Sequence, residues 1–168
     1  MWLLFGLEVI STLLLARPVV LSVEPLTIPL VSCENKTLCE RLFEAARSPT
    51  QNVVLVLKGV EAKARPEVFW EVYVEPPDAT TDTQGPYLVG VVSLFDRGIP
   101  FEEQQSREPA EFLFVLDNAI TAVGRRDLQL RFVSTSGVVV EGQPQIAKVR
   151  SKVTIGEISL AIEVFQQQ

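Results

Sequence analysis

Val68-Phe69-Trp70-Glu71-Val72-Tyr73-Val74 is the stretch that decides the fold of this 168-residue chain. It consists mostly of β-branched and aromatic residues, which are enriched in strands, and it lacks the periodicity of an amphipathic helix. The stretch therefore predicts a buried central strand. A chain of this length is expected to form one domain around one hydrophobic core.

Other segments with strand character lie on both sides of this stretch, at residues 19–23, 26–31, 52–57, 87–95, 111–116, 127–134 and 153–165. Gly90, inside one of them, predicts a bulge or a close backbone approach. Residues 37–47 and a run from Asp117, as the helix cap, to Gly124 predict short helices. No βαβ rhythm occurs. The chain is predicted to be all-β, an antiparallel, jelly-roll-like β-sandwich of about seven or eight strands with one or two short helices.

Composition and charge exclude several classes of function. The formal net charge is −6 at pH 7 and no concentrated Lys/Arg stripe occurs, so binding to nucleic acid is not expected. Arg125-Arg126 is an adjacent basic pair in a predicted turn, where we expect it to be solvated. The sequence contains no His, which removes Ser/His/Asp and Cys/His mechanisms and metal sites built on imidazole.

Acidic side chains are the remaining candidates for catalysis. Glu71, Glu102, Glu103 and Glu108 are the residues that a carboxylate-pair mechanism would need. No spacing sets two of them against each other in a pocket, and acids in loops and on strand faces are usually solvated. We therefore predict no catalytic residue, no cofactor and no bound metal, and we expect that the chain is not an enzyme.

Residues 1–17 form an apolar segment that differs from the rest of the chain. Its length matches the apolar region of a secretory signal, although Glu8 interrupts it and no Lys or Arg precedes it. We interpret residues 1–16 as a signal or membrane anchor, or else as a buried segment or the end of a longer protein. The first interpretation predicts an exported or membrane-tethered protein, and otherwise the protein is cytoplasmic. Residues 18–168 are predicted to form a single β-sandwich domain.

Cys33 and Cys39 are the two cysteines of the sequence. They are close enough to be bridged if the chain between them turns back. An exported location would favour a disulfide and a cytosolic one two free thiols, and two cysteines without His provide too few ligands for zinc. Asn35-Lys36-Thr37 matches the acceptor pattern for N-glycosylation, which is short and occurs often by chance.

Several motifs together resemble the C-terminal domain of polyphenol oxidases and bacterial tyrosinases, which are type-3 copper enzymes. Phe69-Trp70-Glu71-Val72 stands where that family has a Lys-Phe-Asp-Val strand motif, although the first Lys is not kept. Residues 52–61, 85–95 and 111–133 resemble further strands and a short helix of that domain. Val153-Thr154-Ile155-Gly156-Glu157-Ile158 is close to its closing Val-Thr-Ile-Gly-Gly-Ile, so the resemblance covers roughly residues 26–165.

The resemblance implies a sandwich that packs over the dicopper entrance of an oxidase and keeps substrate out until it is removed. Trp70, Val72, Gly90 and Gly156 are then motif positions of the core, with Trp70 and Val72 facing inwards. Phe101 belongs to the segment that matches the enzyme-facing loop, where its ring would plug the entrance; the alternative is that it packs on its own sandwich. Because the His-containing copper domain is absent from these residues, the chain cannot bind type-3 copper on its own.

Three functions follow as hypotheses. The first is a non-catalytic domain that docks on a separately encoded type-3 copper oxidase and shields its active-site entrance. The second is a secreted or membrane-tethered β-sandwich that binds protein or carbohydrate, motivated by the apolar start and the cysteine pair. The third is a fragment of a longer oxidase.

Overall fold

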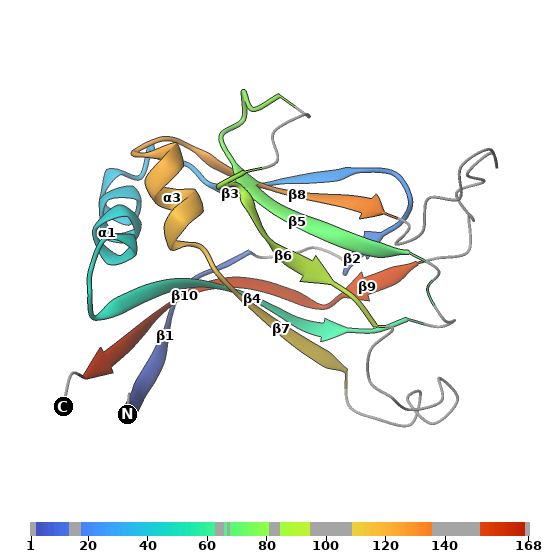
Figure 1. Cartoon of the computed structure of the whole chain (residues 1–168), viewed down its shortest axis with the longest axis horizontal. Helices are drawn as coiled ribbons and strands as arrows, with labels where there is room; N and C mark the ends of the chain where they lie inside the picture. The colour runs from blue at the N-terminus through green and yellow to red at the C-terminus, as the bar shows by residue number, and fades with distance from the viewer. Residues whose placement is uncertain are drawn as a thin grey trace.

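The computed structural model describes residues 3–13, 18–62, 66, 68–80, 85–94, 109–135 and 152–166. Within them the chain forms two four-stranded sheets that face each other, with a two-stranded sheet towards one end and two helices at the other (Figure 1). Every strand pair among the described residues is antiparallel, and these strands do not close into a barrel. The predicted all-β antiparallel sandwich is thereby confirmed.

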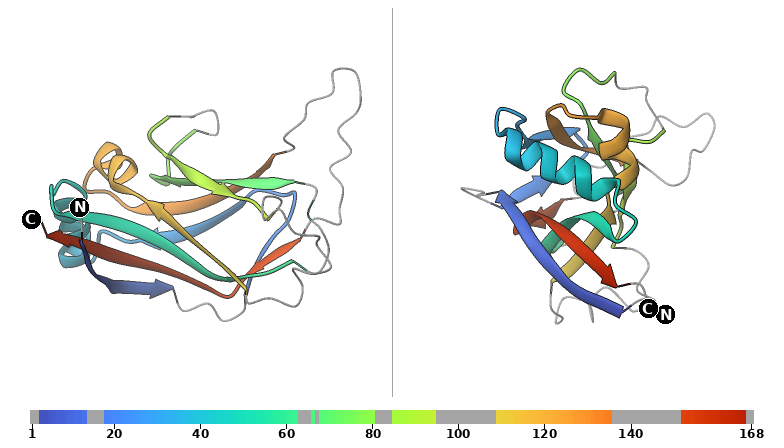
Figure 2. Two further views of the ribbon diagram at one scale, coloured as in Figure 1. Left: turned by 60° about the horizontal axis from the view of Figure 1, so that its bottom comes forward. Right: turned by 90° about the vertical axis from the view of Figure 1, so that its left-hand side faces the viewer.

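The strands are distributed over three sheets. Across the first sheet the order is β1 (Leu3–Leu13), β10 (Glu157–Gln166), β4 (Gln51–Val60) and β7 (Ala110–Val115). Across the second sheet it is β3 (Leu26–Val31), β8 (Leu128–Thr135), β5 (Phe69–Glu75) and β6 (Leu88–Val92). The small sheet pairs β2 (Val19–Leu21) with β9 (Val153–Ile155). Helices α1 (Lys36–Ala46) and α3 (Asp117–Val123) pack against each other at one end of the sandwich (Figure 2).

The main core lies between the two large sheets, because side chains alternate across a strand and one set of each sheet points inwards. The inward residues of the two central strands are almost completely buried: Val53, Leu55 and Leu57 in β4, and Trp70, Val72 and Val74 in β5. Trp70 is the largest of these side chains. Its indole Nε1–H donates to the backbone oxygen of Ser22 at 2.7 Å, so its polar atom is satisfied inside the core.

The closing run that the sequence predicts as one strand is divided at Gly156. β9 precedes this residue in the small sheet, and β10 follows it in the first sheet. The N–H of Gly156 donates to the backbone oxygen of Lys58 at 3.0 Å. Gly59 has φ +64°, and a Cβ added to it would lie 3.4 Å from the nitrogen of Gly156. The two glycines therefore let β4 and the closing strand approach closely where the chain passes from one sheet to the other.

The apolar N-terminal segment provides strand β1 at the edge of the first sheet. β1 pairs with β10 from Leu3, opposite Gln166, to Leu13, opposite Ile158. Glu8 is exposed and accepts a hydrogen bond from Nη2 of Arg41 in α1 at 2.6 Å. β1 and the division at residue 156 give more strands than the sequence predicts, whereas the signal or anchor role of the segment stays a prediction. In the described part of the chain, no helix has the length and apolar character needed to cross a membrane.

Helix α1 begins after Asn35, whose Oδ1 accepts from the backbone N–H of Leu38 at 3.2 Å. A disulfide joins Cys33, ahead of the helix, to Cys39 near its start, with the two Cα atoms 5.2 Å apart. The disulfide, one of the two alternatives for these cysteines, is confirmed. Asn35 itself is exposed, and its glycosylation stays a prediction.

Helix α3 ends at Val123, directly before Gly124 with φ +77°, as the sequence predicts. The predicted cap is wrong, because Leu116 occupies the cap position and Asp117 is the first helical residue. Leu116 and Asp117 instead continue the contact of β7 with β4: the N–H of Leu116 donates to the oxygen of Val53, and the Asp117 carboxylate accepts from the N–H of Val53, both at 2.8 Å. Burial raises the pKa of Asp117 above its ordinary value, and the bond from Val53 opposes that shift.

The basic pair after α3 is half-exposed, but it is bound to acidic side chains rather than merely solvated. Arg125 Nε donates to Glu40 at 2.8 Å, and its guanidinium lies 4.2 Å from the ring centroid of Phe43 in α1. Arg126 pairs with Asp78 at 2.5 Å. Exposed ion pairs of this kind contribute little to stability, so we expect these contacts to orient the turn after α3 rather than to stabilise the fold strongly.

Candidate functional site

Strand β5 has two chemically different faces. Trp70 and Val72 point into the core with 1% and 0% of their surface exposed. The outer face of the second sheet carries polar side chains on β5 and on the neighbouring β8, where Tyr73 lies opposite Arg131 and Glu75 opposite Gln129. We name the five side chains gathered there the outer polar cluster: Glu71, Tyr73, Glu75, Gln129 and Arg131.

A buried ion pair forms the centre of the outer polar cluster. Arg131 donates from Nε to Oε1 of Glu75 at 2.7 Å and from Nη2 to Oε2 at 3.0 Å, a bidentate arrangement. The two residues are only 8% and 1% exposed. Gln129 also donates to Glu75, at 3.2 Å, and the Arg131 guanidinium lies 4.4 Å from the ring centroid of Tyr73. The Tyr73 hydroxyl donates to Glu71 at 2.7 Å, so the cluster satisfies its own polar groups.

Tyr73 and Arg131 of the outer polar cluster both have a raised pKa. Burial raises the pKa of Tyr73 from 10.0 to about 12, and the hydrogen bond to Glu71 acts in the same direction because an ionised phenol would lie against a carboxylate. The hydrogen bond to Glu75 raises the pKa of Arg131 further above its ordinary value. Tyr73 is therefore neutral and Arg131 charged at pH 7, and neither is suited to exchange a proton there.

The predicted acidic residues do not come together into a site among the described residues. Glu71 is half-buried on the outer face and hydrogen-bonded to Tyr73. Phe101, Glu102, Glu103 and Glu108 lie outside the described residues. Across the ranges that the structure describes, no three His, Cys, Asp or Glu side chains are placed to hold a metal ion.

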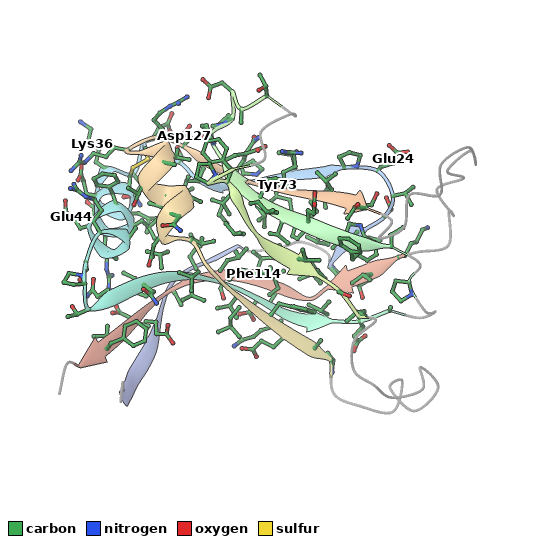
Figure 3. The ribbon with its side chains drawn as sticks, in the orientation of Figure 1. Glu24, Lys36, Glu44, Tyr73, Phe114 and Asp127 are labelled. Carbon is green, nitrogen blue, oxygen red and sulfur yellow. A yellow bond between two sulfur atoms is a disulfide. The ribbon has the colours of Figure 1, made fainter. Side chains whose placement is uncertain are left out.

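Gly90 connects the edge strands of the two large sheets. The β5–β6 register shifts between Val72, opposite Gly90, and Tyr73, opposite Leu88, which confirms the predicted bulge. A Cβ on Gly90 would lie 2.3 Å from Cδ1 of Phe114, the side chain that extends from β7 towards β6 (Figure 3). The missing side chain thus lets an aromatic ring of the first sheet pack on the backbone of the second.

An open groove of about 350 Å³ lies at the end of β3 and β8, lined by Pro29, Leu30, Val31, Ser32, Pro77, Asp127, Leu128 and Gln129. The Asp127 carboxylate accepts from the backbone N–H of Cys33 at 2.7 Å, which ties the groove to the disulfide. Among the described residues that line the groove, Asp127 is the one acidic residue and none is basic. The groove therefore offers hydrogen-bonding groups, including the hydroxyl of Ser32, but no pair of acidic and basic side chains.

Sequence reasoning missed three residues of the outer polar cluster, Glu75, Gln129 and Arg131. A signal was present, because residues 127–134 alternate and place Gln129 and Arg131 on the polar side. Glu75 likewise continues the polar side of β5 beyond Tyr73. Which of these side chains meet depends on the register between β5 and β8, and the sequence pattern of either strand alone does not predict that register.

The fold defines an antiparallel β-sandwich domain capped by two helices. No family model matches the chain, and no curated protein matches it. Two solved structures of latent aurone synthase, a polyphenol oxidase, share the fold: the protein from its natural source with a TM-score of 0.56 and 14% identity, and the recombinantly expressed protein with 0.51 and 13%. The alignments cover 99% and 97% of this chain but 29% and 28% of the oxidase chains. The chain thus has the fold of one part of these oxidases and spans less than a third of their length.

Proposed function

We propose that this chain is a non-catalytic β-sandwich domain that docks on a type-3 copper oxidase and covers its active-site entrance. The observation that carries the proposal is the coverage, since almost the whole chain shares its fold with 29% of a latent polyphenol oxidase. The remaining part of such an oxidase has no counterpart in this chain. Its 168 residues also contain no His, the usual ligand of protein-bound copper.

The internal structure of the sandwich supports a role as a rigid cover. The outer polar cluster, the Gly90–Phe114 contact and the Cys33–Cys39 disulfide fix neighbouring elements to one another. In the sequence Phe101 lies between β6 and β7, among the residues that the structure does not describe. We propose it as the residue that fills the entrance, because an aromatic ring provides contact area and offers copper no oxygen ligand.

The test uses a type-3 copper oxidase purified from the same source and freed of any domain that already covers it. Adding the full chain in molar excess should slow catechol oxidation, and the two proteins should co-elute in gel filtration. Phe101→Ala should still co-elute but inhibit less. If the chain associates with no type-3 copper oxidase of its source, the proposal is wrong.

The same coverage supports a second candidate, in which the sequence is part of a longer oxidase and the sandwich covers an entrance within one polypeptide. Reading the coding frame upstream for a His-containing copper domain distinguishes the two arrangements. The disulfide favours a third candidate, an exported module that binds protein or carbohydrate, because disulfides persist in oxidising compartments. N-terminal sequencing of the mature protein would test export.

A further inference from the structure

The outer face of the first sheet is apolar at positions where a solvated antiparallel sheet normally alternates to polar residues. β4 carries apolar residues on both faces. One set enters the main core, while Val54 and Val56 point the other way and form with Ala161 of β10 a hydrophobic cluster separate from that core. These three side chains are 2%, 1% and 0% exposed.

Two cross-strand pairs extend this cluster to the edge strand β7. Val54 lies opposite Val115, and Val56 lies opposite Leu113. Leu113 and Val115 are 53% and 54% exposed, more than the other large hydrophobic residues whose side-chain burial the structure describes. We name this group of side chains the β4–β7 apolar face: Leu113 and Val115 are its exposed part, and Val54, Val56 and Ala161 are buried beside them.

The margin of the β4–β7 apolar face is polar. Glu111 begins the outward row of β7, and Lys58 and Glu157 lie opposite each other where β4 and β10 meet; all three are exposed. Exposed aliphatic side chains such as Leu113 and Val115, bordered by charged residues, are a common feature of protein–protein interfaces. β7 is also the last strand in the order of the first sheet, so one row of its backbone groups has no partner strand among the described elements.

The edge of the other sheet is a weaker candidate. Leu88 and Val91 on β6 are each 38% exposed, and in the sheet they lie opposite Tyr73 and Glu71 of the outer polar cluster. A surface that already satisfies its charged groups gains less from being covered by a partner. The two edges therefore form a matched pair for an experiment.

We propose that the β4–β7 apolar face is the surface through which this chain contacts the copper oxidase. The inference rests on the proposed function and assigns its contact surface. The occupant is chosen because the latent oxidases that share this fold carry it as 29% of one longer chain, so a sandwich of this kind occurs joined to the rest of an oxidase. The competing occupant is a second copy of this chain, added at the free edge of β7.

The experiment measures binding of the full chain to the purified type-3 copper oxidase by titration calorimetry, with catechol oxidation as a second readout. Leu113→Glu/Val115→Glu introduces two charges on the β4–β7 apolar face and should weaken binding by roughly tenfold or more, as expected where charges enter an interface core. Leu88→Glu/Val91→Glu introduces the same charges at the other edge, and Val20→Glu changes a residue that is 48% exposed on β2. Both controls should bind within about threefold of the wild type, which is less than 1 kcal/mol.

The outcomes separate the two proposals. Wild-type binding that Leu113→Glu/Val115→Glu leaves unchanged, or that the controls weaken equally, would overturn the surface assignment and leave the docking function standing. Absence of wild-type binding would overturn both. If the chain alone sediments as a dimer and Leu113→Glu/Val115→Glu makes it monomeric, the face belongs to a second copy and the oxidase assignment is wrong. Thermal unfolding of each variant confirms that it is folded.

Discussion

The outer face of the second sheet carries charged side chains that pair with one another, whereas the outer face of the first sheet carries aliphatic side chains that continue to an exposed edge. On the former, Glu75 is buried against Arg131, whose guanidinium lies over the ring of Tyr73. On the latter, Leu113 and Val115 remain more than half exposed. The difference teaches that the charged groups of one face already have partners within the chain. On the other face, a partner that covered Leu113 and Val115 would remove apolar surface from water, which is favourable.

The largest expected loss of stability lies on the inner side of β5, in the core between the two large sheets. Trp70→Ala should lower the free energy of unfolding by about 3–5 kcal/mol, because it leaves a cavity and the oxygen of Ser22 loses its donor. Urea unfolding measures this. Phe101→Ala should leave the free energy of unfolding near the wild-type value. Equal losses in the two variants would contradict the division between a core residue and a binding residue.

Glu75→Leu tests whether the buried charges on the outer face of the second sheet depend on each other for stability. It leaves the guanidinium of Arg131 buried without its carboxylate, so the free energy of unfolding should fall by about 3–5 kcal/mol. Glu75→Leu/Arg131→Met removes both charges and should recover most of that loss in the same urea assay. A loss below about 1 kcal/mol for the single variant would mean that the pair behaves as an exposed one.

Alkaline pH should weaken the same face. The pKa of Tyr73 is about 12 in the folded chain against 10.0 ordinarily, so the unfolded chain releases this proton first as the pH rises. Its contribution is fully present below pH 10, declines between pH 10 and 12, and amounts to about 2–3 kcal/mol when lost. Unfolding measured across this range should show a shallower decline for Tyr73→Phe. Identical slopes would contradict the burial of the hydroxyl.

Gly90→Ala tests the contact between β6 of the second sheet and β7 of the first. The added Cβ would lie 2.3 Å from the Phe114 ring, so the ring or β6 must move, and the free energy of unfolding should fall by about 1–3 kcal/mol. Gly90→Ala/Phe114→Leu provides the control, because a smaller side chain relieves the clash. Thermal unfolding of Gly90→Ala, Phe114→Leu and the double variant should show the double variant losing less than the sum of the two single losses.

The smallest effect on stability is expected on the β4–β7 apolar face. Leu113→Glu/Val115→Glu changes residues that are 53% and 54% exposed, so the free energy of unfolding should stay within about 0.5 kcal/mol of the wild type for each site. Urea unfolding next to Leu88→Glu/Val91→Glu makes the comparison. A large loss would show that the face supports the isolated chain, which would remove the contrast with the second sheet.

Most strands could be predicted because their signals are local. The aromatic and β-branched run of β5 and the apolar run of β4 exclude an amphipathic helix, and Gly90 marked its bulge. β1 was predicted differently, since an apolar run without alternation fits a signal segment as well as a strand. The outer polar cluster depends on register, because Glu75 and Arg131 are 56 residues apart in sequence. Predicting the β4–β7 apolar face likewise requires the strand order, in which β7 is the last strand of its sheet.

The strand order also determines when each sheet can form during translation. The second sheet uses residues 26–135, all of which have been synthesised before β10 is made. β10, the last strand along the described chain, lies between β1 and β4 and pairs with both. The first sheet therefore forms only after β10 has been synthesised, and until then the apolar β4 has no β10 beside it. A ribosome-bound chain is expected to expose that strand, which makes this protein a candidate for help from a chaperone.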